Sequence, residues 1–140
     1  MVRINLLPPK NLADQHLIAE YAEILMLVEY IRNYPELAGI PAKFCLGTGH
    51  QKFFKNKLKY LKKRHEQIRK EMKKRGFNPT KTVNLSKIPR FLIKDWRPNK
   101  KDKEIIKKRL RQKISLKPEF YRYYGKKKTK SFLIRLIKQC

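Results

Sequence analysis

The chain has 140 residues, of which 37 are Lys or Arg and only 11 are Asp or Glu, so its formal net charge is +26. This length suits one domain, and a hydrophobic fraction of 41% allows a modest core, which excludes a wholly disordered basic tail. Neither a transmembrane run of roughly 18 apolar residues nor a secretory signal pattern is present. The sequence therefore predicts one domain over residues 1–140, outside the membrane, whose partner is a polyanion such as nucleic acid.

The positive charge is distributed unevenly along the chain. Residues 1–42 hold three basic and five acidic side chains, whereas residues 43–140 hold 34 basic and six acidic ones. Because carboxylates repel phosphates, the first third either packs away from a nucleic acid or carries chemistry that needs a carboxylate. The two cysteines do not form a disulfide framework, which favours an intracellular, cytoplasmic protein.

The first third of the chain predicts an extended arm followed by a helix. The arm covers residues 3–10, and Asn11 has the chemistry of an N-cap for a helix that ends near residue 33, before Pro35. Helical spacing places an imidazole and two carboxylates on one side of this helix, namely His16, Glu20 and Glu23. Loop residues dominate the segment 34–47.

A second helix is predicted from Thr48, as N-cap, to Gly76, just beyond its C-terminus. Apolar side chains recur along it at steps of three and four. Its other faces are crowded with basic residues and are expected to contact phosphates rather than to form an ordinary solvated face. These residues are Lys57, Lys59, Lys62, Lys63, Arg64, Arg69, Lys70, Lys73, Lys74 and Arg75.

The last part of the chain predicts a long irregular loop over residues 77–100 and a third helix from Asp102, as cap, to Ser115. Four aromatic residues within positions 120–124 stand next to basic ones, a composition suited to stacking on exposed bases. Such density also favours packing in the core, so we expect some of these rings to be buried and others exposed. Residues 127–140 form a basic tail with one short helix. The pattern predicts an all-α fold.

Metal, nucleotide and protease sites find little support in the sequence. The three histidines and two cysteines lack the spacing of paired metal ligands, and residues 47–49 lack the remaining elements of a P-loop. We therefore expect no metal and no cofactor. Taken by itself, Glu23 would be interpreted as a surface residue.

The order of several motifs resembles the bacteriophage-type pyrimidine dimer DNA glycosylases, the phage endonuclease V family. The similarity includes MVRINL at residues 1–6, LADQHL at 12–17, AEYAE at 19–23, LGTGH at 46–50 and KRGFN at 74–78. It continues through Phe53-Phe54, Lys57-Leu58, Arg109-Leu110, Lys113-Ile114 and residues 118–126. It spans nearly the whole chain, although the loop near residues 33–45 is shorter and the tail after Lys126 is longer than in the phage enzyme.

The resemblance implies one compact domain of three main helices, with the N-terminal arm threaded between them. It implies a DNA glycosylase coupled to an abasic-site lyase, acting on double-stranded DNA with UV lesions or abasic sites. The nucleophile would be the α-amine of Val2 once the initiator Met is removed, and Glu23 the essential carboxylate. Residues expected near this centre or on the DNA are Arg3, Gln15, His16, Arg109, Lys113, Tyr121, Arg122, Tyr123 and Lys126. We expect a monomer, nucleoid-associated or viral in origin.

Some positions depart from the phage pattern. Val2 stands where Thr is usual, and Phe120 replaces a Trp. Ala22 and Met26 occupy positions at which the phage enzyme carries arginines that clamp phosphates. Two alternatives therefore stay open: a lyase or glycosylase of this fold with another lesion preference, and a non-catalytic basic protein that binds nucleic acid.

Overall fold

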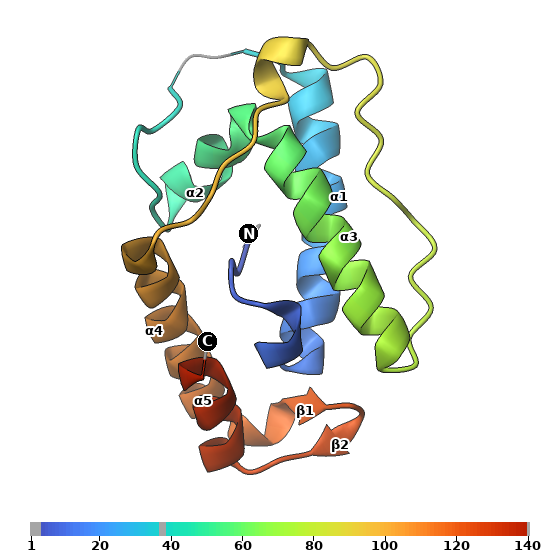
Figure 1. Cartoon of the computed structure of the whole chain (residues 1–140). Helices are drawn as coiled ribbons and strands as arrows, with labels where there is room; N and C mark the ends of the chain where they lie inside the picture. Colours follow the sequence, from blue (N-terminus) through green and yellow to red (C-terminus); the bar gives the residue numbers. More distant parts are fainter. Residues whose placement is uncertain (1–3, 37–38, 140) are drawn as a thin grey trace.

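The computed structural model describes residues 4–36 and 39–139. Within these ranges it contains five α-helices and one two-stranded sheet (Figure 1). The prediction of an all-α fold is therefore confirmed only to the extent that the fold is mainly helical, because the small sheet was not predicted. The helices are α1 (Asp14–Asn33), α2 (Thr48–Phe53), α3 (Leu58–Lys74), α4 (Lys100–Leu116) and α5 (Lys130–Lys138). No helix in the described ranges combines the length and the apolar character needed to cross a bilayer.

Helices α1 and α3 pack against each other through apolar side chains at helical spacing. The buried apolar residues are Leu17, Ile24, Leu27, Val28 and Ile31 on α1, and Leu58, Leu61, Ile68 and Met72 on α3. Each large aliphatic side chain buried in this way contributes about 1.5–3 kcal/mol. Helices α4 and α5 form a second pair.

The N-terminal arm enters the space between the two helix pairs, as Figure 1 shows. Ile4 and Leu7 on the arm are fully buried, and so is Leu12 just before α1. A short 3-10 helix, η1 (Pro9–Asn11), connects the arm to the first helix. The arm is therefore part of the hydrophobic core.

The predicted continuous second helix is wrong, because the chain breaks it into α2, a 3-10 turn (Phe54–Asn56) and α3. The break falls at Lys57, whose φ of −125° is not helical. There Lys57 pairs with Ile93 in an isolated antiparallel bridge, and Trp96 packs edge-on against Phe53 and Phe54. This packing with a segment distant in sequence outweighs the local helical preference.

The end of α3 agrees with the sequence. Gly76 follows the helix with a φ of 93°, and the Phe77 N–H donates to the Met72 carbonyl at 2.9 Å. This is the glycine-terminated helix end that the left-handed conformation permits.

Three predicted helix caps are wrong. Helix α1 starts at Asp14 with Ala13 as its N-cap, and Asn11 instead donates from its side chain to the Leu136 carbonyl on α5 at 2.7 Å. Helix α4 is capped by Asn99, and Asp102 is the third residue of the helix, where it completes a capping box. Thr48, the predicted cap of the second helix, is instead the first residue of α2, whose N-cap is Gly47. In all three cases the true cap lies one to three residues from the predicted position.

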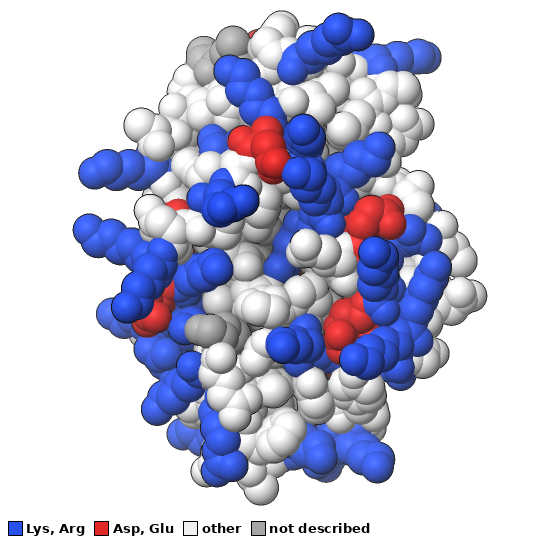
Figure 2. All heavy atoms as spheres, viewed as in Figure 1, with Lys and Arg blue, Asp and Glu red and all other residues white. Residues whose placement is uncertain are grey.

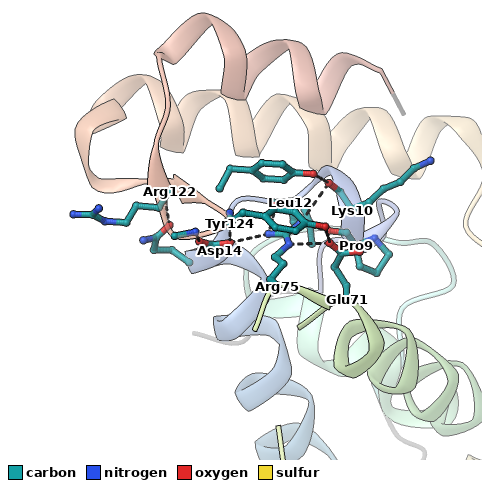
Figure 3. A network of polar contacts seen from close by, with 11 residues as sticks. Pro9, Lys10, Leu12, Asp14, Glu71, Arg75, Arg122 and Tyr124 are labelled. Carbon is teal, nitrogen blue, oxygen red and sulfur yellow. Dashed lines mark hydrogen bonds and ion pairs between the residues drawn. The ribbon is translucent and has the colours of Figure 1, made fainter. Parts of the chain in front are cut away.

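Arg75 holds the start of α1, the end of α3 and the C-terminal hairpin together (Figure 3). Its side chain is fully buried and forms ion pairs with Asp14 at 3.0 Å and Glu71 at 2.8 Å. Asp14 also accepts hydrogen bonds from the backbone N–H groups of Tyr124 and Gly125. These last two residues form the turn between strands β1 (Arg122–Tyr123) and β2 (Lys126–Lys127), both with positive φ.

The basic face predicted along the second helix is therefore only partly available to a ligand. Arg64 and Arg75 are buried in internal ion pairs, so the expectation that they contact phosphates is wrong. The exposed lysines of α3 are Lys59, Lys62, Lys63, Lys70, Lys73 and Lys74. Burial of the two arginines reflects the planar guanidinium, which satisfies several acceptors at once.

Candidate active site

A small pocket of about 150 Å³ lies where the arm, α1 and α4 meet. Its lining residues come from four parts of the chain and are Asn5, His16, Ala19, Glu23, Arg109, Lys113 and Tyr121. Five of these seven, all but Asn5 and Ala19, are among the predicted site residues. The pocket is too small to enclose a nucleotide, so a substrate would react at its mouth.

Helix α1 presents His16 and Glu23 to the pocket two turns apart, with Ala19 between them. Glu20, the third residue predicted on the same side of the helix, is not among the described residues that line the pocket. Glu20 is fully buried and pairs with Arg64 of α3 at 2.7 Å. Of the two carboxylates expected on one side, only Glu23 lines the pocket.

His16 is held against Tyr121, with ring centroids 4.7 Å apart. Burial lowers the pKa of His16 to about 4, and the nearby charges of Arg109 and Lys113 act in the same direction. The imidazole is therefore neutral at physiological pH. Its Nδ1 atom and the Oδ1 atom of Asn5 are buried without a hydrogen-bond partner among the described residues. Such atoms are uncommon, and two of them belong to residues that line this pocket.

Helix α4 supplies the positive charge of the pocket. Arg109 and Lys113 stand one turn apart, and so project from the same face of the helix. They share the pocket lining with Glu23, which makes the site mixed in charge although its surroundings are basic. Figure 2 shows Lys and Arg side chains over much of the face that it draws, with few acidic groups between them.

Four of the other predicted residues, Gln15, Arg122, Tyr123 and Lys126, are not among the described residues that line the pocket. Gln15 accepts a hydrogen bond from the Arg122 N–H at 2.9 Å, which ties α1 to the hairpin. The Tyr123 hydroxyl donates to the Lys10 carbonyl, and its ring covers Arg75. Arg122 and Lys126 are exposed. Val2 and Arg3 lie outside the described residues.

The aromatic segment is a mixture of buried and exposed rings, as predicted. Tyr121 is 8% exposed and Phe120 is 57% exposed, with Tyr124 at 38%. Tyr124 also donates a hydrogen bond to Glu71. Some of these aromatic residues therefore stabilise the fold, and Tyr121 lines the pocket.

Sequence reasoning missed the residues that hold the arm beside the pocket. His50 is fully buried and accepts a hydrogen bond from the Ile4 N–H, and Glu20 accepts one from the Asn5 N–H. The available sequence signal is a lone His at the end of the LGTGH motif, which lacks the spacing of metal ligands and to which no role is assigned from the sequence. In the described part of the chain no group of three or more His, Cys, Asp or Glu side chains is arranged to hold a metal.

A sequence model of the pyrimidine dimer DNA glycosylase family matches residues 1–85. The chain belongs to this family. The match includes the arm, α1, α2 and α3, and thus the positions of Glu23 and His16. Membership supports a DNA repair enzyme with glycosylase activity, whose family acts on DNA that contains pyrimidine dimers. Residues 86–140 lie outside the match, so the contributions of Arg109, Lys113 and Tyr121 rest on the pocket geometry.

Proposed function

We propose that this glycosylase excises cyclobutane pyrimidine dimers through an imine at its N-terminal α-amine and then cuts the strand by β-elimination. Val2 supplies the amine after removal of Met1, and Glu23 supplies the carboxylate. The observation that carries the proposal is the pocket in which Glu23 meets the arm and the two cations of α4.

The reach of the chain supports this assignment. Asn5 lines the same pocket as Glu23. Two residues separate Val2 from Asn5, and the Cα atom of Val2 lies at most about 7 Å from that of Ile4, because each residue of extended chain spans about 3.5 Å. This short covalent distance supports the proposal that the amine acts at the pocket.

The chemistry suits an α-amine. An α-amino group has a pKa of about 8 against about 10.4 for Lys, so its neutral, nucleophilic fraction at pH 7 is roughly 200-fold larger. Positive charge nearby favours the neutral form further. The pKa of His16 is lowered first by burial and then by the charges of Arg109 and Lys113, and these charges would act in the same direction on an amine at this site.

In the proposed reaction the amine nitrogen bonds to C1′ as the glycosidic C–N bond breaks, and the base leaves with the electron pair and takes up a proton. The C1′–O4′ bond then opens with its electron pair going to O4′, which gains a proton, while the nitrogen lone pair forms the C1′=N double bond. The nitrogen has then lost both protons of the amine, one matching the proton gained by the base and one matching that gained by O4′, and the product is the neutral imine. The imine makes the C2′ proton acidic. Its removal expels the 3′ phosphate with the electrons of the C3′–O bond. Glu23 stabilises the positive charge at C1′ and carries protons in these steps.

Binding of the DNA is assigned to the basic residues. Arg109 and Lys113 would hold the phosphates that flank the sugar at the pocket, together with Arg3, Arg122 and Lys126. Gln15, His16, Tyr121 and Tyr123 would contact the DNA or support these contacts. Because the pocket does not admit a nucleotide, the duplex must be bent and the sugar brought to the pocket mouth.

Borohydride trapping tests the proposal. The processed protein is mixed with duplexes that carry a pyrimidine dimer or an abasic site, and the covalent adduct is counted after reduction. Adducts with both duplexes are expected. An adduct with abasic DNA alone would favour an enzyme of the same fold with another lesion preference. That alternative is considered because Ala22 and Met26, both exposed, stand where the phage enzyme carries arginines. Absence of any adduct would leave a non-catalytic DNA-binding protein.

A matched pair of variants tests Glu23. Glu23→Gln should keep DNA binding and lose strand cleavage by at least about 100-fold, as expected for loss of a general acid–base group. Glu36→Gln changes the net charge equally at an exposed position and should cleave normally. Acetylation of the α-amine should abolish the adduct in the wild-type chain. Cleavage by Glu23→Gln at the Glu36→Gln rate would show that the carboxylate is misassigned.

A further inference from the structure

The backbone of the N-terminal arm is held by a buried imidazole. The Nε2 atom of His50 accepts a hydrogen bond from the Ile4 N–H at 2.8 Å, and its Nδ1 lies 3.0 Å from the Cys45 carbonyl oxygen. His50 and Ile4 are both fully buried. Because a backbone N–H can only donate and a carbonyl can only accept, the two contacts together require a neutral ring with its proton on Nδ1.

A second contact holds the next residues of the arm. Glu20 on α1 accepts from the Asn5 N–H at 3.2 Å and forms a two-pronged pair with Arg64 of α3 at 2.7 and 3.1 Å. Arg64 also donates to the Leu7 carbonyl. Side chains from α1, α2 and α3 thus bind nearby polar groups of one short stretch of backbone.

The backbone between these contacts is strained. Leu6 has a φ of 58°, a conformation that a bulky L-residue rarely adopts. Such a conformation persists only where surrounding contacts enforce it, and it is often found at functional sites. The arm therefore has a single register, with Ile4 held by His50 and Asn5 at the pocket that contains Glu23.

We propose that His50 is a positioning residue for the reaction, because its hold on the Ile4 N–H determines how far the residues before Ile4 reach toward Glu23. The inference rests on the proposed function, in which the amine belongs to Val2. His50 does not touch the substrate. It acts two residues from the nucleophile, where a displacement of about 1 Å costs about 100-fold in rate.

Two substitutions separate the two hydrogen bonds of His50. In His50→Gln the side-chain oxygen can take the place of Nε2 and accept from Ile4. In His50→Asn the shorter amide can take the place of Nδ1 and donate to Cys45, but it does not reach Ile4. Both variants remove the ring from the same aromatic surroundings, with Phe44 and Phe54, so they share the loss of packing.

The readouts are the single-turnover rate of borohydride trapping on abasic duplex, the dissociation constant for the same duplex, and the melting temperature. The trapping rate of His50→Asn should be at least about 10-fold lower than that of wild type, and its dissociation constant should stay within about twofold of the wild-type value. The trapping rate of His50→Gln should stay within about threefold of wild type. Ile137→Ala on α5, a buried residue away from His50, provides a variant destabilised without loss of the Ile4 contact and should trap normally below its melting temperature.

A semisynthetic variant removes the donor without touching any core side chain. Cys45 allows a synthetic segment of residues 2–44 to be ligated to residues 45–140, and an ester in place of the amide between Arg3 and Ile4 eliminates the N–H that His50 binds. This chain should show the same slow trapping as His50→Asn. If His50→Asn does not fold, the ester chain alone tests whether the hydrogen bond between the Ile4 N–H and His50 affects the trapping rate.

The outcomes separate the two proposals. If the wild-type chain forms no adduct, the proposed function fails. If the wild type forms the adduct and the ester chain or a folded His50→Asn traps at the wild-type rate, only the role of His50 is overturned. Slow trapping by a folded His50→Gln equal to that of His50→Asn would also overturn it, because the ring rather than the bond to Ile4 would then matter.

Discussion

Replacing Arg75 tests whether one buried guanidinium holds three parts of the fold together. Its side chain is fully buried and makes five hydrogen bonds to described residues, the acceptors being Glu71, Asp14 and the carbonyls of Leu12, Pro9 and Lys10. The rings of Tyr123 and Tyr124 lie over it, with centroids 4.6 and 5.0 Å from Cζ. Figure 3 shows how these acceptors surround the guanidinium.

The magnitude follows from what each substitution leaves unpaired. In Arg75→Met both Asp14 and Glu71 lose the cation with which they pair in a buried site, and breaking such a pair by removing one partner costs about 3–5 kcal/mol. In Arg75→Lys the charge remains, but three donors cannot serve five acceptors. Two lost bonds at about 1 kcal/mol each, with weaker stacking on the rings, give about 2–3 kcal/mol. The melting temperature of Arg75→Lys should fall by about 10 °C.

Urea unfolding followed by circular dichroism measures these differences. Arg135→Lys makes the same change at an exposed position of α5 and should alter the free energy of unfolding by less than about 0.5 kcal/mol. The double variant Arg75→Met/Glu71→Gln should recover part of the loss, because one uncompensated charge is removed. A loss below about 1 kcal/mol in Arg75→Lys would refute the reasoning, since it would mean that the fork geometry contributes little.

Three further predictions concern the site and the helix ends. The pKa of His16 is lowered to about 4, so the unfolded chain binds a proton near pH 6.5 while the folded chain does not. The wild type should therefore lose stability as the pH falls. Between about pH 7 and pH 4.5 its free energy of unfolding should decrease by about 2 kcal/mol more than that of His16→Gln. Equal losses in urea titrations at the two pH values would contradict this. Met26→Arg places a cation on the exposed face of α1. It should steepen the slope of log affinity against log salt by about 0.9, which is the effect of one more phosphate contact. An unchanged slope in fluorescence titrations would show that this face does not contact the DNA. Asn99→Ala removes the capping box of α4 and should cost about 1 kcal/mol in urea unfolding, and a neutral result would mean that the cap is not formed.

The long helices could be predicted because their apolar residues recur at helical spacing. Helix α1 ends at the expected residue 33, and α3 ends at Lys74, shortly before the Gly76 predicted to lie just beyond it. The break at Lys57 could not be predicted. It depends on a partner at Ile93, and no local pattern at residues 53–58 reveals a contact with a segment so distant in sequence.

Charge pattern alone could not distinguish the buried arginines from the surface lysines. Arg64 and Lys63 are adjacent in sequence, yet one is buried against Glu20 and the other forms an exposed pair with Asp95. What selects Arg64 is the face of α3 on which it lies and the carboxylate that α1 places opposite. A carboxylate that looks like a site residue in the sequence, Glu20, is therefore part of the internal structure.

Part of the pocket lining could be predicted from helical spacing in the sequence, and part was expected from the family resemblance. Helical spacing alone brings His16 and Glu23 to one side of α1, and the same spacing joins Arg109 to Lys113. That the two helices meet at one pocket follows only from tertiary packing. His50 was missed because its partner, Ile4, lies 46 residues earlier.

The contacts of the arm also determine when it can reach its final place during synthesis. Its partners lie far downstream: His50 is 46 residues from Ile4, Arg64 is 57 residues from Leu7, and Leu136 is 125 residues from Asn11. The arm is thus among the last segments of the described chain to reach its place, because closing such long loops must wait for the distant partner. In the proposed mechanism, assembly of the site at the arm is therefore a late step of folding.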